Sequence, residues 1–378
     1  MDAKVTGPRV GITGSYGGLN LGDEAILESI LRPLREELHA QVVVFSRNTK
    51  DTVQRHGVEA LPVRTMTRDE SREAIRGLDL LIFGGGGILY DEEAQIYLRE
   101  ANLAHEMKVP VMAYGLSAGP LTKPHNRQAV RESLNRCAAI TVRDRHGQRL
   151  LQDLGVEVPV RVTADPALLL QPAEFPEDLW QHEGLAGKPR VAAFSVREPG
   201  PAAPDLDIEH YHALVANAAD FVVERLDMDV VFVPMERSKL DVQHSHAVAG
   251  KMQNAPRTTV LKGEYTSGQL LALFKRFDFA IGMRLHFLIF AARQGVPFVS
   301  LPYASKVEGF IEELELPSPP VLGDLNAGTL MAHIDRSWDY RTHLAERITR
   351  HLPNLQARAQ ENESILRGLL AHKDRLRA

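Results

Sequence analysis

The expected fold is decided by residues 278–302, which read DFAIGMRLHFLIFAARQGVPFVSLP. An apolar strand passes into a helix near Leu285, the helix stops at Gly295, and a second apolar strand follows. The first strand ends at Arg284, just before His286. Ligands of α/β proteins bind outside the carboxyl ends of parallel strands. A cation and a proton-transfer group at such a place indicate an anionic substrate and acid/base chemistry.

The same alternation of strand and helix extends in both directions from this segment. Further strands are expected at residues 9–13, 41–45, 78–83, 109–114, 138–143, 158–163, 190–196, 229–234, 258–261 and 297–301. Short apolar runs separated by helical patterns are typical of mostly parallel sheets that helices cover on both faces. We therefore predict an α/β protein with two Rossmann-like domains and a central cleft.

The boundary between the two domains is indicated by a lapse in this pattern. From Gln171 to Lys188 the chain is rich in Pro, Glu, Asp and Gly, which is typical of a linker. We predict an N-terminal domain, a linker, a C-terminal domain and a helical segment that packs back on the N-terminal domain, over residues 1–170, 171–188, 189–339 and 340–378.

The composition excludes several classes of function. Of the 378 residues, 44% are hydrophobic and 25% charged, and the net charge of −5 argues against bulk attraction to nucleic acid or anionic lipid. The single cysteine, Cys137, excludes an intrachain disulfide and a Cys-rich metal site, and we expect it to be a buried structural thiol. A signal-peptide pattern and a membrane-spanning apolar run are both missing from the sequence. These features fit a cytoplasmic protein.

A glycine-rich loop follows the first strand, from Gly14 to Gly22, and a helix begins near Asp23. It matches neither the GxGxxG fingerprint nor a P-loop. Such a turn lets backbone N–H groups approach a ligand oxygen, although ordinary turn chemistry explains the same residues. Pro33 should kink the helix or end it near Arg32. The candidate ligand contacts are Gly14, Tyr16, Asn20, Gly22 and Asp23.

A second loop is expected at residues 84–87, where four glycines follow a strand. One turn does not need four glycines, so they suggest close approach of the backbone to a ligand or to another loop, with Gly85 and Gly86 as candidate ligand contacts. A tight strand-to-helix crossover is the alternative.

Three arginines stand at the ends of predicted strands: Arg143, Arg197 and Arg284. Arginine binds carboxylate or phosphate through a bidentate fork, so these side chains can form an anion site together with Gly282. Taken singly, each arginine could equally be a solvated or salt-bridged residue.

His286 lies in the first turn of a helix that is apolar nearly all round. A histidine there is either a proton-transfer group at the mouth of the cleft or a core residue with a buried partner. The sequence leaves both possibilities open.

Asp241, His244 and His246 resemble a metal cluster, but their spacing does not match a strong zinc template. We instead expect a helix start at Asp241 that contacts substrate or solvent, and no metal site. The roles of the two histidines stay open.

The ordered set of these pieces resembles the polysaccharide pyruvyltransferase family, and within it the bacterial branch that modifies secondary cell-wall polymers, the anchors of S-layer proteins. The resemblance spans about residues 9–310. The matching pieces lie at residues 11–27, 84–87, 114–120, 142–144, 165–167, 195–197 and 282–286.

The resemblance implies a glycosyltransferase-B-like arrangement, with the sugar acceptor on the N-terminal domain and the donor, phosphoenolpyruvate, on the C-terminal domain. It also implies that no cofactor is needed. Arg143, Arg284 and His286 match the family's donor-binding and catalytic positions, and Arg197 matches less closely. The loop residues and Asp241 fall on the acceptor side. The implied acceptor is N-acetylmannosamine in a lipid-linked disaccharide, which would bring the enzyme into peripheral contact with the inner face of the membrane.

Two other functions remain as alternatives. A nucleotide-sugar glycosyltransferase of the same architecture also places polar residues at the last strand-to-helix turn of its second domain. A non-catalytic glycan-binding protein fits less well, because neutral sugars need stacking aromatics more than cations and only 6% of the residues are aromatic. The sequence does not specify the oligomeric state.

Overall fold

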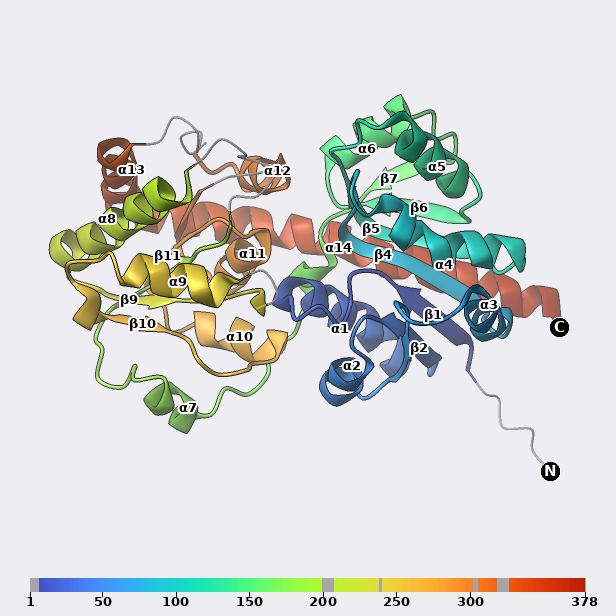
Figure 1. Ribbon diagram of the computed structural model, residues 1–378, viewed down its shortest axis with the longest axis horizontal. Helices are drawn as coiled ribbons and strands as arrows, with labels where there is room; N and C mark the ends of the chain where they lie inside the picture. The colour runs from blue at the N-terminus through green and yellow to red at the C-terminus, as the bar shows by residue number, and fades with distance from the viewer. Residues whose placement is uncertain (1–6, 199–206, 238–239, 302–304, 318–325, 378) are drawn as a thin grey trace. The chain divides into compact units, whose positions relative to one another are not determined.

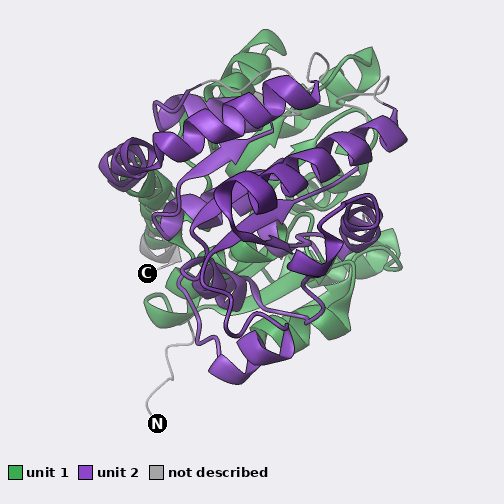
Figure 2. Ribbon diagram, turned by 90° about the vertical axis from the view of Figure 1, so that its left-hand side faces the viewer, with its two compact units in different colours: residues 1–19, 23–170, 355–378 green, residues 20–22, 171–354 purple. Residues whose placement is uncertain are grey.

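The structure is a computed structural model that describes residues 7–198, 207–237, 240–301, 305–317 and 326–377. It divides into two compact units (Figure 2). Unit 1 comprises residues 1–19, 23–170 and 355–378, and unit 2 comprises residues 20–22 and 171–354. Residues 20–22 therefore belong to the second unit, although the chain on both sides of them belongs to the first.

Unit 1 contains a seven-stranded parallel sheet with the order β3-β2-β1-β4-β5-β6-β7 (Figure 1). The chain moves outward from β1 to β3 and then returns to the other side of β1, so the topological switch point lies between β1 and β4. The strands are β1 Arg9–Thr13, β2 Gln41–Ser46, β3 Glu59–Pro62, β4 Leu80–Leu89, β5 Val111–Ala118, β6 Ala139–Val142 and β7 Val160–Val162.

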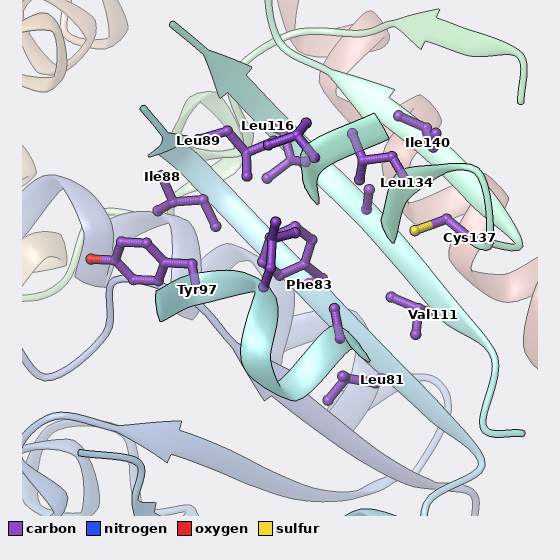
Figure 3. Close-up of a cluster of buried hydrophobic side chains, with 14 of the residues drawn as sticks. Leu81, Phe83, Ile88, Leu89, Tyr97, Val111, Leu116, Leu134, Cys137 and Ile140 are labelled. Atoms are coloured by element: carbon purple, nitrogen blue, oxygen red, sulfur yellow. The ribbon is translucent and has the colours of Figure 1, made fainter. Parts of the chain in front are cut away.

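The helices of unit 1 cover both faces of this sheet. Figure 1 shows α4 on one face and α14 on the other. The elements are α1 Leu21–Glu36, α2 Thr49–His56, α3 Arg68–Arg76, α4 Ala94–Glu106, α5 Pro124–Leu134, α6 Arg145–Asp153 and the short 3₁₀ helix η1 Pro166–Leu169. The core between β4, β5 and helices α3 to α5 is drawn in Figure 3, and it contains Cys137 as a buried thiol. Burial on both faces explains why the central strands read as continuous apolar runs.

Unit 2 repeats the design with five parallel strands in the order β10-β9-β8-β11-β12, and its switch point lies between β8 and β11. The strands are β8 Val191–Ser195, β9 Asp229–Phe232, β10 Thr258–Val260, β11 Phe279–Gly282 and β12 Phe298–Ser300. The helices are α7 Glu177–His182, α8 Ile208–Leu226, α9 Asp241–Ala249, η4 Ala255–Arg257, α10 Ser267–Phe274, α11 Leu285–Arg293, α12 Ser305–Glu313 and α13 Ala327–Asp339. A separate cluster of buried apolar side chains fills its interior.

The last helix, α14 Arg341–Arg377, contributes to both units. Its second half packs on unit 1, where the buried amide of Asn362 accepts a hydrogen bond from Thr163 (3.0 Å) and donates one to the Ala164 carbonyl (3.4 Å). Two ion pairs join it to α1 and the turn that follows, Arg32 with Glu363 and Glu37 with Arg367.

The α/β class with two Rossmann-like sheets is confirmed, and four local predictions are corrected. The glycines at 84–87 do not form a loop, because β4 continues through them to Leu89, and β5 likewise continues to Ala118. The short edge strand β3 is not among the predicted strands. The helix α1 continues through Pro33 to Glu36, so of the two alternatives predicted at Pro33 the break near Arg32 is wrong. The predicted linker contains the helix α7.

Among the described helices, none combines the length and apolar character that a membrane crossing needs.

Candidate functional site

Arg143 is the centre of a buried cluster in unit 1, which we call the Arg143 cluster: Arg143, Asp144, Asp165 and the adjacent backbone of Gly86 and Gly87. Arg143 directly follows β6 and is 7% exposed. Its Nη1 binds Asp165 Oδ2 at 2.7 Å, and its Nε lies 3.9 Å from Asp144 Oδ2. Asp144 also caps α6 by accepting from the Gly147 N–H at 2.6 Å. The guanidinium is therefore fixed in place by neighbours on both sides.

The glycines of β4 lie against this guanidinium. Gly84, Gly85 and Gly86 have φ values of +120°, +90° and +83°, which L side chains rarely adopt. A Cβ at Gly86 would lie 3.4 Å from Asp23 Oδ1 and 4.0 Å from Arg143 Nη1, and Gly87 is exposed next to Arg143 Nη2. The glycines therefore let the backbone of β4 approach the Arg143 guanidinium closely.

Tyr16 is not a surface residue of the glycine-rich turn, contrary to its selection as a ligand contact. It is 0% exposed, and its hydroxyl donates to the carbonyl of Gly84. Burial raises the pKa of Tyr16 well above its usual value, with Asp23 and Glu24 adding to the effect, so the hydroxyl stays protonated. Gly14 is buried between this ring and Gly84. Tyr16 therefore ties the two glycine-rich segments together.

A buried pair that the sequence analysis did not select supports the same turn. Glu24 is 1% exposed, accepts from the Gly17 N–H at 2.9 Å, and meets His56 Nε2 at 2.8 Å. A carboxylate in the first turn of a helix is commonly a simple dipole partner. From the sequence, Glu24 therefore looks like any acidic residue in the first turn of a helix.

Residues 20–22 form part of unit 2. Asn20 makes an antiparallel bridge with Glu236, and the Leu21 N–H donates to the Met235 carbonyl at 2.8 Å. The hydroxyl of Ser267 donates to the Leu21 carbonyl at 2.7 Å. These contacts position the backbone of Gly22 in the second unit.

Arg284 is the centre of the corresponding group in unit 2, the Arg284 cluster: Arg284, Asp241, Glu236 and His286. Arg284 lies between β11 and α11 and is 7% exposed. Its Nε and Nη2 donate to Asp241 at 2.7 and 2.5 Å, and its Nη1 donates to Glu236 Oε2 at 2.8 Å. The two carboxylates hold the planar fork in one orientation.

Asp241 begins α9 as expected, but its predicted contact with solvent is wrong because the residue is 0% exposed. Besides Arg284, it accepts from the backbone N–H groups of Met235 (3.1 Å) and Glu236 (3.0 Å). Burial raises the pKa of Asp241, and Arg284 opposes that rise. Asp241 therefore orients the side chain of Arg284.

His286 is half-buried in the first turn of α11, with its ring against the backbone of Gly22. A Cβ added to Gly22 would lie 1.9 Å from His286 Nδ1, so only glycine allows this approach. The structure thus explains why a glycine stands at position 22.

The remaining candidates contact protein groups. Arg197 is half-buried just beyond β8, and its Nε donates to the Glu198 carbonyl at 2.7 Å. Gly282 is buried between Phe287 and Ser195, where a Cβ would lie 2.6 Å from Phe287, which is a packing reason for the glycine. On α9, His244 Nδ1 lies 3.0 Å from His212 Nε2, and His246 is exposed. Among the described residues, no group of three or more His, Cys, Asp or Glu side chains is placed to hold a metal.

The predicted site residues fall into two sets. Gly14, Tyr16, Asp23, Gly85, Gly86 and Arg143 belong to unit 1, and Asn20, Gly22, Arg197, Asp241, Gly282, Arg284 and His286 belong to unit 2. Each set lies at the carboxyl ends of central strands near a switch point, which is where α/β proteins bind ligands.

Comparisons with solved structures show the fold. The UDP-GlcNAc 2-epimerase of Neisseria meningitidis is similar over 96% of this chain and 99% of its own, with a TM-score of 0.64 and 11% identity. A glycosyltransferase of Rickettsia africae is similar over 96% of this chain and 98% of its own, with a TM-score of 0.61 and 11% identity. The fold is thus that of the glycosyltransferase-B type.

Comparisons of sequence show the family. The amylovoran biosynthesis protein AmsJ of Erwinia amylovora is 22% identical over 309 residues, which cover 78% of this chain and 72% of the relative. Residues 20–305, which include the whole Arg284 cluster and Arg143, match the family model described as polysaccharide pyruvyl transferase. The chain therefore belongs to the polysaccharide pyruvyl transferase family and is an enzyme, a transferase of polysaccharide biosynthesis.

Proposed function

We propose that this enzyme transfers the enolpyruvyl group of phosphoenolpyruvate to two hydroxyls of one sugar in a cell-wall polysaccharide precursor. The products are a cyclic pyruvate ketal and phosphate. The observation that supports this most strongly is the buried Arg284, fixed by Asp241 and Glu236 two residues before a half-buried histidine. A preorganised cation suits a donor that carries both a carboxylate and a phosphate.

The chemistry balances without an added cofactor. The first sugar hydroxyl adds to C2 of phosphoenolpyruvate while C3 receives a proton, so the methylene becomes a methyl group. The bond from C2 to the phosphate oxygen then breaks, and the second hydroxyl closes the ring at C2. The two sugar hydroxyls release two protons in all. One balances the proton added to C3, and the other leaves with the phosphate.

The residues receive separate roles in this proposal. His286 transfers a proton, because it stands two residues after Arg284 and imidazole is the side chain that most often acts as a general acid or base. Arg284 binds the donor phosphate or carboxylate. Arg143 and Arg197 are anion-binding residues of units 1 and 2. Asn20, Gly22, Asp23, Gly85 and Gly86 lie beside these groups and belong to the acceptor side or its supporting backbone.

Two variants test the role of His286. His286→Ala should lower phosphate release from phosphoenolpyruvate by about 10²–10⁴-fold, the usual contribution of a general acid or base. Gly22→Ala should also lower it, because the new methyl group displaces the imidazole. The matched controls are His246→Ala, an exposed histidine, and Gly309→Ala, where a Cβ meets nothing within 4 Å. Near-native phosphate release by His286→Ala would reject the assignment.

Arg284→Lys tests the donor-binding role while keeping the positive charge between two carboxylates. Lysine lacks the planar guanidinium that binds an anion through two parallel hydrogen bonds. The KM for phosphoenolpyruvate should therefore rise by about tenfold or more, with the circular dichroism spectrum unchanged. An unchanged KM would argue against contact with the donor.

A separate test distinguishes the rival function. Stabilisation of the native protein by a UDP-sugar but not by phosphoenolpyruvate would favour a nucleotide-sugar glycosyltransferase instead.

The acceptor proposed is N-acetylmannosamine in a secondary cell-wall polymer precursor, because the ordered motifs resemble that branch of the family. Product mass spectrometry with phosphoenolpyruvate and a panel of sugar acceptors identifies it. A mass gain equal to a pyruvate ketal on another sugar alone would exclude this acceptor and leave the reaction intact.

A further inference from the structure

A cavity of about 200 Å³ lies wholly within unit 1, at the carboxyl ends of β1, β2 and β3. Gly14 follows β1, Arg47 follows β2, and Arg64 lies just beyond β3. The helix α4 closes another side with Ile96 and Arg99. It is near the switch point, but neither the Arg143 cluster nor the Arg284 cluster lines it.

The charge of the lining is the main observation. Among its described residues are three guanidinium groups, Arg47, Arg64 and Arg99, and one carboxylate, Glu100. Arg99 is already committed, because its Nε binds Glu100 at 2.6 Å and its Nη2 binds the Val63 carbonyl at 2.5 Å. Glu100 also interacts with the charge of Arg64, so its single carboxylate leaves an excess of positive charge in a lining with three guanidinium groups.

Arg47 is held in place by the glycine-rich turn. Its Nη2 donates to both the carbonyl and the hydroxyl of Ser15 at 2.8 Å, and Gly18 packs against the guanidinium so closely that a Cβ would lie 1.9 Å from Nη2. These contacts fix the position of the Arg47 guanidinium at the wall of the cavity.

Arg64 and Tyr97 form the outer wall. The Arg64 guanidinium carbon lies 5.9 Å from the centre of the Tyr97 ring, and Arg64 is exposed. Figure 3 shows the Tyr97 ring at the edge of the apolar core of unit 1, with its hydroxyl directed away from that core. Ile96 beside it is 47% exposed, which offers an apolar surface to the rest of a ligand.

We propose that this cavity is an anion subsite that binds a phosphate or diphosphate group of the acceptor, between Arg47 and Arg64. The inference rests on the proposed function, because it assigns the acceptor to the class of phosphate-linked sugars. A lining with two more guanidinium groups than carboxylates matches a diphosphate linkage, which carries about one negative charge on each phosphate, better than a sugar carboxylate with a single charge. The cavity is smaller than the roughly 300–1,000 Å³ of typical ligand pockets, so it suits a charged group rather than a whole oligosaccharide.

Binding is measured by titration calorimetry on the full chain with inorganic pyrophosphate as the probe. Arg64→Glu and Arg47→Ala should each weaken its binding by about tenfold or more. The matched control is Arg76→Glu, an exposed arginine at the end of α3 that is outside the cavity lining. Pyrophosphate binding that is unchanged in both cavity variants would overturn the proposal, provided that circular dichroism shows both to be folded.

Three further probes identify the source of the phosphate. Tighter binding of a short-chain polyprenyl-diphosphate sugar than of pyrophosphate supports a lipid carrier, and tighter binding of UDP-N-acetylglucosamine supports a nucleotide carrier. Binding of glucuronate as strong as that of pyrophosphate, and equally dependent on Arg64, would overturn the phosphate assignment in favour of an acidic sugar.

The failure of the subsite and that of the proposed function give different results. If the native enzyme releases no phosphate from phosphoenolpyruvate but Arg64-dependent binding of the diphosphate probes persists, the proposed function fails and the anion subsite remains. If turnover occurs and the KM for the acceptor is the same in Arg64→Glu and Arg76→Glu, the subsite fails and the proposed function remains.

Discussion

Arg284 is held by two carboxylates of one segment far from it in the sequence, and only one of them was visible as a candidate beforehand. Asp241 marks a helix start, whereas Glu236 lies in a segment without a motif. An arginine at a strand end can be found from the sequence because strand ends follow from the apolar pattern. Its partners lie 43 and 48 positions away, and such pairings depend on how strands and helices pack.

Asp241→Asn should destabilise the protein strongly. The change keeps the size of the side chain but removes a charge that is fully buried against Arg284, and breaking such pairs costs about 3–5 kcal/mol. Urea denaturation measures the loss of unfolding free energy. The control is Asp227→Asn, whose carboxylate is 74% exposed and pairs with Arg190 and Arg257, and it should cost at most about 1 kcal/mol. Equal losses would show that Asp241 is not an essential partner.

His105 on α4 should make the protein less stable in acid. Desolvation, with Arg136 adding to it, lowers the pKa of His105 to about 4 in the folded state, whereas an unfolded histidine titrates near 6.5. The unfolded state thus binds more protons between these values, and stability falls as the pH drops from about 6.5 to about 4. Below that range both states are protonated and His105 adds no further slope.

The measurement is the melting temperature as a function of pH. His105→Gln should flatten the curve between about pH 4 and 6.5, and His125→Gln, which changes an exposed histidine on α5, should leave it unchanged. A curve with the same slope in native protein and His105→Gln would assign the acid sensitivity to other groups.

At the scale of the element, β4 shows where sequence reasoning succeeds and fails. The apolar residues at its start identify a strand, but four consecutive glycines read as its end, because glycine weakens strands. The strand continues because its neighbour β5 pairs with it as far as Leu89 and because Tyr16 ties Gly84 to the turn after β1. Both causes are long-range contacts, and the edge strand β3 escaped detection because its buried apolar pattern is weak.

Gly85→Ala and Gly57→Ala separate backbone strain from lack of space. Gly85 has φ +90°, and a Cβ there would lie 2.4 Å from Ile26 Cγ2, whereas Gly57 has φ +58° and nothing within 4 Å. Gly57→Ala should cost about 1 kcal/mol. Gly85→Ala should cost more, because strain of about 1–3 kcal/mol adds to an overpacking cost of similar size. Thermal denaturation compares the two, and similar losses would mean that Ile26 gives way without cost.

At the scale of the whole molecule, the sequence predicts two α/β sheets well because their periodic apolar runs are local. It does not reveal that residues 20–22 join unit 2. This assignment has no local signal, since it follows from long-range contacts such as that of Leu21 with Met235. The chain thus passes between the units more often than its linear pattern indicates.

The assignment of α14 predicts where a core mutation in this helix will act. Leu366 is 0% exposed and belongs to unit 1, although residues 171–354 of unit 2 precede it in the chain. Leu366→Ala should cost about 2–5 kcal/mol and should weaken hydrogen-exchange protection in β1 and β4. Leu330→Ala, a matched leucine that is 0% exposed on α13, should instead weaken protection in β8 and β9. Each unit has its own buried cluster, so the two patterns should differ. If both variants lose protection equally in both sheets, the two units unfold as one cooperative body, and neither unit has a free energy of unfolding of its own.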